Sequence, residues 1–291
     1  MPASFEEILV SRPFKFIIGP DEVPIVVHEA VLAEQSPELA ALMRGEMAES
    51  IAGESRWMDV DKGTFVRFAQ FAYTGNYSTP KGSTAQAVVE AESSAPPQEP
   101  GLIDGRESAW QFPPSRPPLS APRPPHSAQF SFAFPPPPRP PSASDMFNSL
   151  KYPLIESRSN LCACKPSMND GPIESSGEVL LAHASLYVLA EKWGVNSLKM
   201  LVLSKLHQTL STLHLDASRV QEVIDLARYA YLDSSTPDLG TEIDELRKLI
   251  CLYIAANVEV VSEHNSFMDL IEGGGAFVRD LWKRVVPKKP T

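Results

Sequence analysis

The sequence predicts an α+β fold, in which a small sheet is surrounded by helices and a long proline-rich insert divides the chain. Apolar residues alternate within 14–18, and a Pro-Asp turn then leads to the β-branched run 23–27, a pattern that indicates a hairpin. Apolar side chains recur at helical spacing in residues 61–75 and again from residue 179 onward. Between these parts, Pro80 to Pro172 hold 20 of the 28 prolines, a composition that cannot bury enough apolar surface to offset the entropy of ordering.

Local signals place the elements that follow the hairpin. Ser36 is expected to cap a helix with Pro37 at its first position, where a missing N–H costs nothing. Residues 56–60 are then predicted to form a third strand. Asp61 is expected to cap a helix that ends at Gly75, a residue suited to a left-handed C-cap. Aromatic residues at helical spacing should point this helix toward the core: Phe65, Phe68 and Phe71.

Beyond the insert the sequence predicts only helices. Residues 179–193 form the first, ending at Gly194, and Asn196 is expected to cap the second. The later helices are predicted at 217–231, 242–257, 265–272 and 276–286. The run of three glycines at 273–275 lacks the Lys and Ser or Thr of a phosphate-binding loop, so it is read as a break between the last two helices.

Several ordered phrases carry a family resemblance. They are 14–18, His28-Glu29-Ala30-Val31-Leu32, Ser36-Pro37-Glu38-Leu39, 45–50, 65–71 and Tyr73-Thr74-Gly75, with 186–194 after the insert. Together they resemble the BTB/POZ domain, a protein-interaction fold, in the form common among filamentous-fungal proteins. The resemblance implies a domain split into 1–77 and 179–215, with a C-terminal helical extension at 216–291. The Pro-rich insert at 78–178 is predicted to be disordered from its composition. The resemblance also implies that Phe65, Phe68 and Leu186 share one core.

Two features depart from the dimerising members of that family. Those members carry an Asp just before the first strand and a Lys after the helix-start His, forming a charged pocket at the dimer seam. Here Arg12-Pro13 and Glu29 occupy these places, and the segment before Phe14 is short for a strand-swapped helix. Homodimerisation is therefore left open.

The resemblance implies a non-catalytic scaffold or interaction module. Met47-Ala48-Glu49 resembles the motif with which BTB adaptors of cullin-type ubiquitin ligases contact the cullin, so Met47 and Glu49 are candidate partner-binding residues. Physically, an exposed Met offers an adaptable apolar contact and Glu a charge at its rim. The alternative for the segment is a plain loop. The alternative for the chain is a transcription cofactor or regulatory scaffold that acts through BTB-mediated oligomerisation.

The insert offers a second candidate partner site. Phe134 is followed by four prolines, and such runs favour polyproline II, which aromatic grooves of polyproline-recognition domains bind. Phe134, Pro135 and Pro138 are the candidate contacts. The alternative is a solvated spacer without a partner.

The sequence gives no basis for an active site. The chain shows no Gly-x-Ser-x-Gly elbow, paired-acid arrangement or metal triad. Cys162-Ala163-Cys164 is too poor in partners for zinc, and the histidines lack ligand spacing, His28 being expected to be structural. We therefore predict no enzyme activity, cofactor or metal.

Charge and hydropathy narrow the partners to other proteins. A net charge of −10 and a pI near 5.2 oppose direct binding to nucleic acid. No apolar run reaches the ~18 to 20 residues that cross a bilayer, so no membrane contact is predicted. The three cysteines suit a reducing compartment, and the expected location is the cytoplasm, the nucleus or both.

Overall fold

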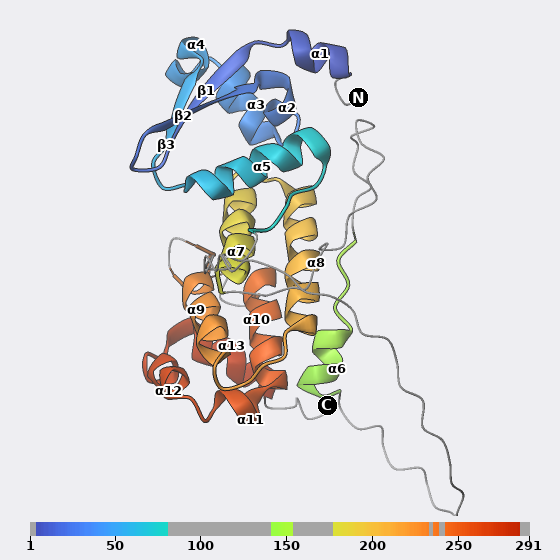
Figure 1. Cartoon of the computed structure of the whole chain (residues 1–291), viewed down its shortest axis with the longest axis vertical. Helices are drawn as coiled ribbons and strands as arrows, with labels where there is room; N and C mark the ends of the chain where they lie inside the picture. The colour runs from blue at the N-terminus through green and yellow to red at the C-terminus, as the bar shows by residue number, and fades with distance from the viewer. Residues whose placement is uncertain (1–3, 81–140, 154–176, 233–234, 239–241, 286–291) are drawn as a thin grey trace, which may run out of the picture. The chain divides into compact units, whose positions relative to one another are not determined.

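The computed structural model describes residues 4–80, 141–153, 177–232, 235–238 and 242–285. They belong to one compact unit, Met1–Ser83 with Pro140–Thr291, whereas the second unit, Thr84–Arg139, lies outside the described residues. A small sheet and many helices make up this unit (Figure 1). The α+β class is therefore confirmed. None of the described helices is both long and apolar enough to span a bilayer.

The elements before the insert are α1 (Phe5–Val10), β1 (Pro13–Ile18), β2 (Val23–His28), α2 (Glu29–Ala33), α3 (Pro37–Arg44), α4 (Ala48–Ala52), β3 (Glu54–Trp57) and α5 (Lys62–Thr74). The later elements are α6 (Ala143–Asn148), α7 (Gly177–Lys192), α8 (Asn196–Thr212), α9 (Val220–Ala230), α10 (Glu245–Ala256), α11 (Val258–Val261), α12 (Asn265–Glu272) and α13 (Gly275–Val285).

The sheet has the order β2-β1-β3, with β1 antiparallel to β2 and parallel to β3. The predicted hairpin is confirmed, and its register pairs Phe16 with Ile25. The third strand begins two residues earlier than predicted, because α4 ends at Gly53, whose left-handed conformation (φ 64°) turns the chain directly into the sheet. Phe16 is fully buried and lies 4.9 Å from the ring of Phe65 on α5.

Most of the predicted helix ends are confirmed. The Ser36 side chain accepts from the backbone N–H of Leu39, and the Asp61 side chain accepts from that of Thr64. Gly75 ends α5 with φ 71°. The prediction for Asn196 is wrong, because Asn196 is the first residue of α8 and Val195 is the N-cap, without a side-chain hydrogen bond.

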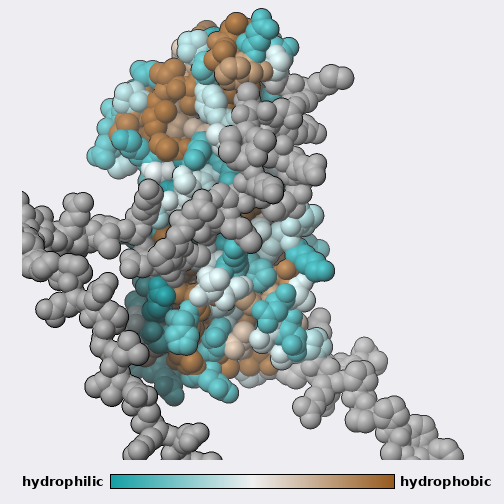
Figure 2. Space-filling model, turned by 45° about the vertical axis from the view of Figure 1, so that its right-hand side comes forward, coloured by the Kyte–Doolittle hydropathy of each residue, from teal (hydrophilic) through white to brown (hydrophobic). Residues whose placement is uncertain are grey.

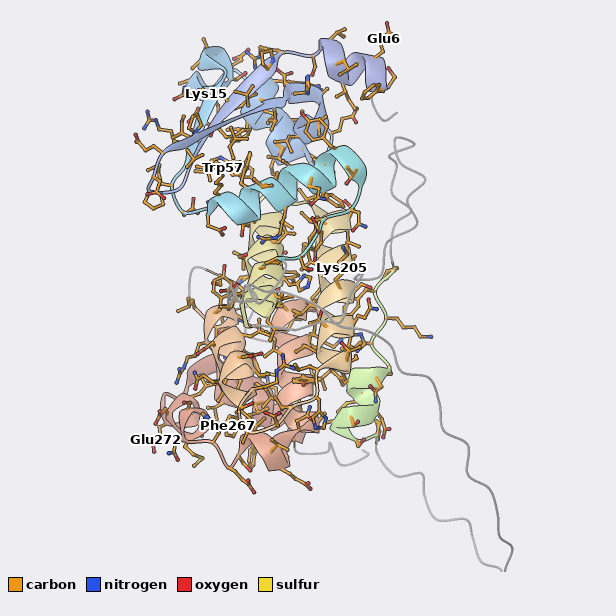
Figure 3. The ribbon with its side chains drawn as sticks, in the orientation of Figure 1. Glu6, Lys15, Trp57, Lys205, Phe267 and Glu272 are labelled. Carbon is orange, nitrogen blue, oxygen red and sulfur yellow. The ribbon has the colours of Figure 1, made fainter. Side chains whose placement is uncertain are left out.

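One hydrophobic core joins the two sides of the insert. Phe65, Phe68 and Leu186 are all fully buried in the same cluster, as predicted. Trp57, labelled in Figure 3, stacks on Trp193 with ring centroids 4.6 Å apart. α5 therefore lies between the sheet and α7, and the chain on both sides of the insert is needed to complete this core.

The helices after residue 215 belong to the same core. The fully buried Tyr187 of α7 donates its hydroxyl to Asp244, 2.9 Å away, and the other carboxylate oxygen of Asp244 accepts from the backbone N–H groups of Leu246 and Arg247. Asp244 thus caps α10 and holds α7 at once. The predicted helical extension exists, and it packs on α7 and α8 as a continuation of one cluster.

The predicted disordered insert, 78–178, includes ordered residues at 141–153, and α7 begins at Gly177, inside its predicted end. The segment 141–153 contains α6, whose Phe147 is only 5% exposed. Ala143, Met146, Phe147 and Leu150 repeat at helical spacing, and Ser142 with Asp145 forms a capping box at the helix start. The surrounding prolines hid this short pattern. The remaining predicted insert, 81–140 and 154–176, lies outside the described residues.

A buried polar cluster fixes the point where the chain leaves α5. The Tyr77 hydroxyl lies 2.7 Å from Nδ1 of His183, and Lys205 donates from Nζ to the Tyr77 carbonyl at 2.6 Å while lying over its ring (Lys205 is labelled in Figure 3). Burial lowers the pKa of His183 to about 3, helped by the charge of Lys205, and lowers the pKa of Lys205 to about 8. His183 is therefore neutral in the folded protein.

This burial predicts a loss of stability in acid. Once unfolded, His183 regains an ordinary pKa of 6.5, so below that pH the unfolded chain binds one more proton than the folded chain. The His183 contribution, complete above pH 6.5, should fall by about 1.4 kcal/mol per pH unit, or about 2 kcal/mol at about pH 5. The free energy of unfolding of the wild type and of His183→Gln would be measured in denaturant at pH 6.5 and at about pH 5. The difference between the two proteins isolates the His183 contribution, since the carboxylates titrate in both. Equal pH dependence of the two proteins would contradict the assignment.

Candidate protein-interaction surface

Helix α4 presents a small apolar surface with an acidic neighbour. Met47 is the N-cap of α4 and is 58% exposed, while Ile51 is 79% exposed. The backbone N–H of Ile51 donates to the Met47 carbonyl at 3.1 Å, so the two residues lie one helical turn apart on the same side. Glu49 is exposed in the first turn. We call Met47, Glu49 and Ile51 the α4 edge.

The opposite side of α4 is anchored to the core. Ser50 is buried and donates its hydroxyl to the carbonyl of Met43, 2.7 Å away, at the end of α3. The turn between α3 and α4 also requires Gly45, because a Cβ there would meet the Ala41 carbonyl oxygen at 2.3 Å. Met47-Ala48-Glu49 is therefore the start of a well-anchored helix rather than a loop. Whether the segment binds a partner stays a prediction.

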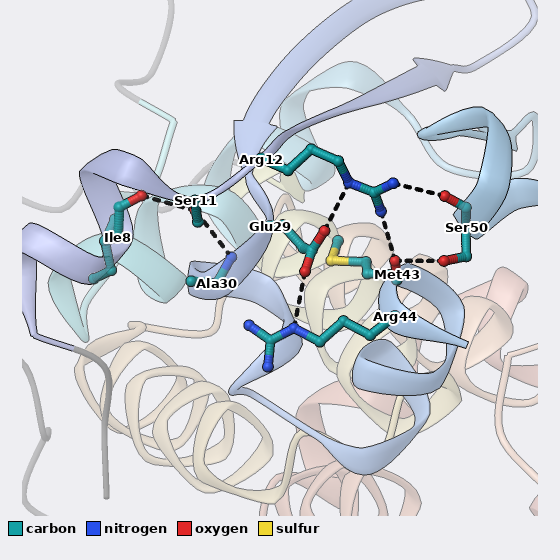
Figure 4. A network of polar contacts seen from close by, with 8 residues as sticks. All are labelled: Ile8, Ser11, Arg12, Glu29, Ala30, Met43, Arg44 and Ser50. Atoms are coloured by element: carbon teal, nitrogen blue, oxygen red, sulfur yellow. Dashed lines mark hydrogen bonds and ion pairs between the residues drawn. The ribbon is translucent and has the colours of Figure 1, made fainter. Parts of the chain in front are cut away.

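Arg12, just before β1, holds α4 in place through hydrogen bonds to residues of α3 and α4 (Figure 4). Its guanidinium donates to the carbonyl of Ser50 at 2.8 Å and to the carbonyl of Met43 at 2.7 Å. Its Nε donates to Glu29 at 2.9 Å, and the second carboxylate oxygen of Glu29 accepts from Nε of Arg44, also at 2.9 Å. Residues before β1, in α2, in α3 and in α4 thus meet at one network, and the α4 edge is presented on a fixed support.

The charges of this network are matched within the chain. Glu29 is mostly buried, with its side chain 14% exposed, and it pairs with both Arg12 and Arg44. The two carbonyls that Arg12 binds lie near helix ends and accept a second bond each, the Met43 carbonyl from the Ser50 hydroxyl and the Ser50 carbonyl from the backbone N–H of Gly53. The network can position its neighbours, and Arg12 keeps part of its side chain (43%) exposed to solvent.

Other exposed apolar side chains lie on the same part of the chain. In Figure 2, brown apolar side chains gather on the upper part of the surface, which residues 4–80 form. The large exposed ones in this range, besides Met47 and Ile51, are Phe5, Leu9, Val10, Val26, Met58 and Val66. Exposed apolar groups that gather in this way are typical of protein-binding surfaces.

The other predicted residues fall into two groups. Phe134, Pro135 and Pro138, together with Cys162 and Cys164, lie outside the described residues. His28 is structural, as predicted: its Nδ1 lies 2.8 Å from the hydroxyl of Tyr73, which also accepts from the His28 backbone N–H.

The described residues show little that could hold a metal or act as a nucleophile. No group of three or more His, Cys, Asp or Glu within 4–80, 141–153, 177–232, 235–238 and 242–285 has metal-binding geometry. Cys251 is fully buried, and burial raises the pKa of its thiol to about 12, although a hydrogen bond with Tyr231 acts in the opposite direction. Cys251 is therefore a protonated core residue.

Sequence reasoning missed Ile51 and the Arg12 network. The spacing Met47-x-x-x-Ile51, followed by Gly53 as a possible C-cap, could have indicated a short helix with both side chains on one face. The bonds of Arg12 to residues near 43 and 50 had no local signal.

Comparison of the chain with known protein families and with characterised proteins found no match to either.

Proposed function

We propose that this chain is a non-catalytic protein-interaction module of the BTB/POZ type, and that the α4 edge is its partner-binding surface. The observation that carries the proposal is the exposed pair Met47 and Ile51 beside Glu49, held on a rigid support by Arg12 and Ser50. Two large exposed apolar side chains that adjoin on one face of a fixed helix, with a charge beside them, are the kind of surface that a partner protein covers.

The family part of the proposal rests on ordered sequence phrases and on element order. The resemblance implies two strands, a helix starting at His28, a helix starting at Ser36, a third strand and an aromatic helix ending at Gly75. The described elements β1, β2, α2, α3, β3 and α5 follow one another in this order, with α4 added before β3. This agreement supports the proposal.

In this proposal the chain works by binding alone. Several described groups with strongly shifted pKa values, His183, Lys205 and Cys251, lie inside the core, where each bonds to a neighbouring group of the chain. The pairing of Arg12 with Glu29 also favours a scaffold or adaptor over the oligomerising alternative, because the positions of the family's dimer pocket are neutralised within one chain.

The most specific form of the proposal is a substrate adaptor for a cullin-type ubiquitin ligase. In that form Met47 and Ile51 fill an apolar pocket on the cullin, and Glu49 meets a basic group at the rim. Changing Met47→Ala together with Glu49→Lys should weaken binding by more than ~2 kcal/mol, about thirty-fold, as expected for central contacts.

Calorimetric titration against a cullin N-terminal domain from the same organism measures this. The matched control is Met268→Ala with Glu272→Lys, since these residues are an exposed Met and Glu on α12. It should bind like the wild type. Absence of binding by the wild type at tens of micromolar, or equal binding by both double variants, would remove the ligase-adaptor form of the proposal.

A further inference from the structure

Helix α6 is joined to the rest of the described structure by side-chain packing rather than by adjacent elements. It lies between the stretches 81–140 and 154–176, so sixty residues separate it from the described chain before it and 23 from the chain after it. In space it lies against α10, beside α8 (Figure 1). Its position is therefore set by what it contacts.

The contacts centre on one aromatic side chain. The Phe147 ring packs edge-on against the imidazole of His207 on α8, with centroids 4.6 Å apart, and lies 5.4 Å from the ring of Tyr253 on α10. The ring of Tyr152 also contacts His207, with centroids 5.9 Å apart. Phe147 is 5% exposed, and Ala143, Met146 and Leu150 add partly buried apolar contacts. α6 thus inserts an aromatic anchor into a groove between α8 and α10.

The two rings that contact Phe147 are uncharged. Burial lowers the pKa of His207, although a hydrogen bond with the Phe147 main chain opposes this shift, and burial raises the pKa of Tyr253 to about 12. Both rings are therefore neutral under ordinary conditions and present an aromatic surface. An amphipathic helix that enters a groove through apolar residues at i, i+3, i+4 and i+7 is a recurrent mode of peptide recognition.

The helix also carries its own start signal. Ser142 accepts from the backbone N–H of Asp145, and the Asp145 carboxylate accepts from the backbone N–H of Ser142, at 3.1 and 3.0 Å. These bonds lie wholly within the segment, so its helical form does not depend on caps from elsewhere. The segment 141–153 has the parts of a peptide ligand: an internal cap, an aromatic anchor and apolar neighbours on one face.

We propose that residues 141–153 are an intramolecular ligand, docked reversibly through Phe147 into the groove between α8 and α10, and that this groove binds the same segment supplied by a second copy of the chain. Residues 81–140 and 154–176 tether the segment to the chain on both sides. Attachment to the chain raises its effective concentration at the groove, so the chain's own segment is the normal occupant.

The test separates the segment from the folded protein. Protease sites are placed within 81–140 and 154–176 of the full chain, the purified protein is cut at both, and a fluorescent peptide of residues 141–153 is titrated by anisotropy. The cut protein should lose its fragment on gel filtration and bind the peptide saturably. The uncut protein should bind it at least about ten-fold more weakly, because the tethered segment competes.

Peptide variants locate the anchor. Phe147→Ala in the peptide should weaken binding at least about thirty-fold, whereas Lys151→Ala, at an exposed position, should leave it unchanged. The proposal is overturned if the cut protein keeps its fragment and never exchanges it, if it releases the fragment but binds no peptide, or if the uncut protein or the Phe147→Ala peptide binds equally well. None of these outcomes involves the α4 edge, so the proposed function is tested separately.

Discussion

Replacing Phe68 by alanine is expected to lower the free energy of unfolding by ~3 to 5 kcal/mol, the usual cost of a cavity left by a fully buried Phe. Phe68 lies 6.3 Å from Trp57 of the sheet and shares its cluster with Leu186 of α7. The loss should appear in guanidinium unfolding followed both by far-UV circular dichroism and by tryptophan fluorescence. Trp57 and Trp193 lie on opposite sides of the insert and stack on each other, so the fluorescence signal reports the packing of both parts of the chain.

The matched control is Val66→Ala on the same helix, where Val66 is 47% exposed and a change of less than ~0.5 kcal/mol is expected. If the described residues unfold as one unit, the two signals should give coincident transitions in the wild type and in Phe68→Ala. A loss below ~1 kcal/mol for Phe68→Ala, or two separate transitions in the wild type, would show that 4–80 and 177–285 do not share one core.

Replacing Asp244 by alanine is expected to cost about 3 kcal/mol, because one side chain performs two tasks. It removes the N-cap of α10, worth about 1 kcal/mol, and leaves the buried Tyr187 hydroxyl without its acceptor, worth about 2 kcal/mol more. Asp61→Ala is the control, since Asp61 caps α5 but holds no second group that the described contacts show. That variant should lose only the cap term, about 1 kcal/mol.

A double-mutant cycle with Tyr187→Phe separates the two terms of Asp244. Removing the Tyr187 hydroxyl should make the subsequent Asp244→Ala change cost about as much as Asp61→Ala. Chemical denaturation provides all four values. Additive effects of Tyr187→Phe and Asp244→Ala would contradict the role assigned to Asp244 in joining α7 to α10.

Local signals predicted the helix ends and part of the core well. Ser36, Asp61 and Gly75 act within three or four residues of themselves, so their roles follow from short-range hydrogen bonding and from the left-handed conformation that Gly allows. Asn196 failed because the left-handed Gly194 lets the helix begin at Asn196, with Val195 left as the N-cap. Helix preference alone could not distinguish these positions.

The elements that sequence reasoning missed are short or depend on distant partners. α6 spans Ala143–Asn148, too short to stand out in a proline-rich stretch, and its order comes from His207 and Tyr253 far along the chain. α4 spans only Ala48–Ala52, and Arg12, 38 positions before Ser50, holds it in place. The exposure of Ile51 therefore depends on a distant residue. Such contacts join residues tens of positions apart, and no periodicity records them.

Binding of a partner protein at the α4 edge can be tested by quantitative co-purification with surface variants. Tagged wild-type chain, Ile51→Asp and the control Met268→Asp would be expressed in the native organism, and the captured proteins quantified by mass spectrometry. Both positions are exposed, so both variants should keep the wild-type melting transition. At least one protein captured by the wild type and by Met268→Asp should be lost with Ile51→Asp. Capture of the same proteins in the same amounts by all three chains would contradict it.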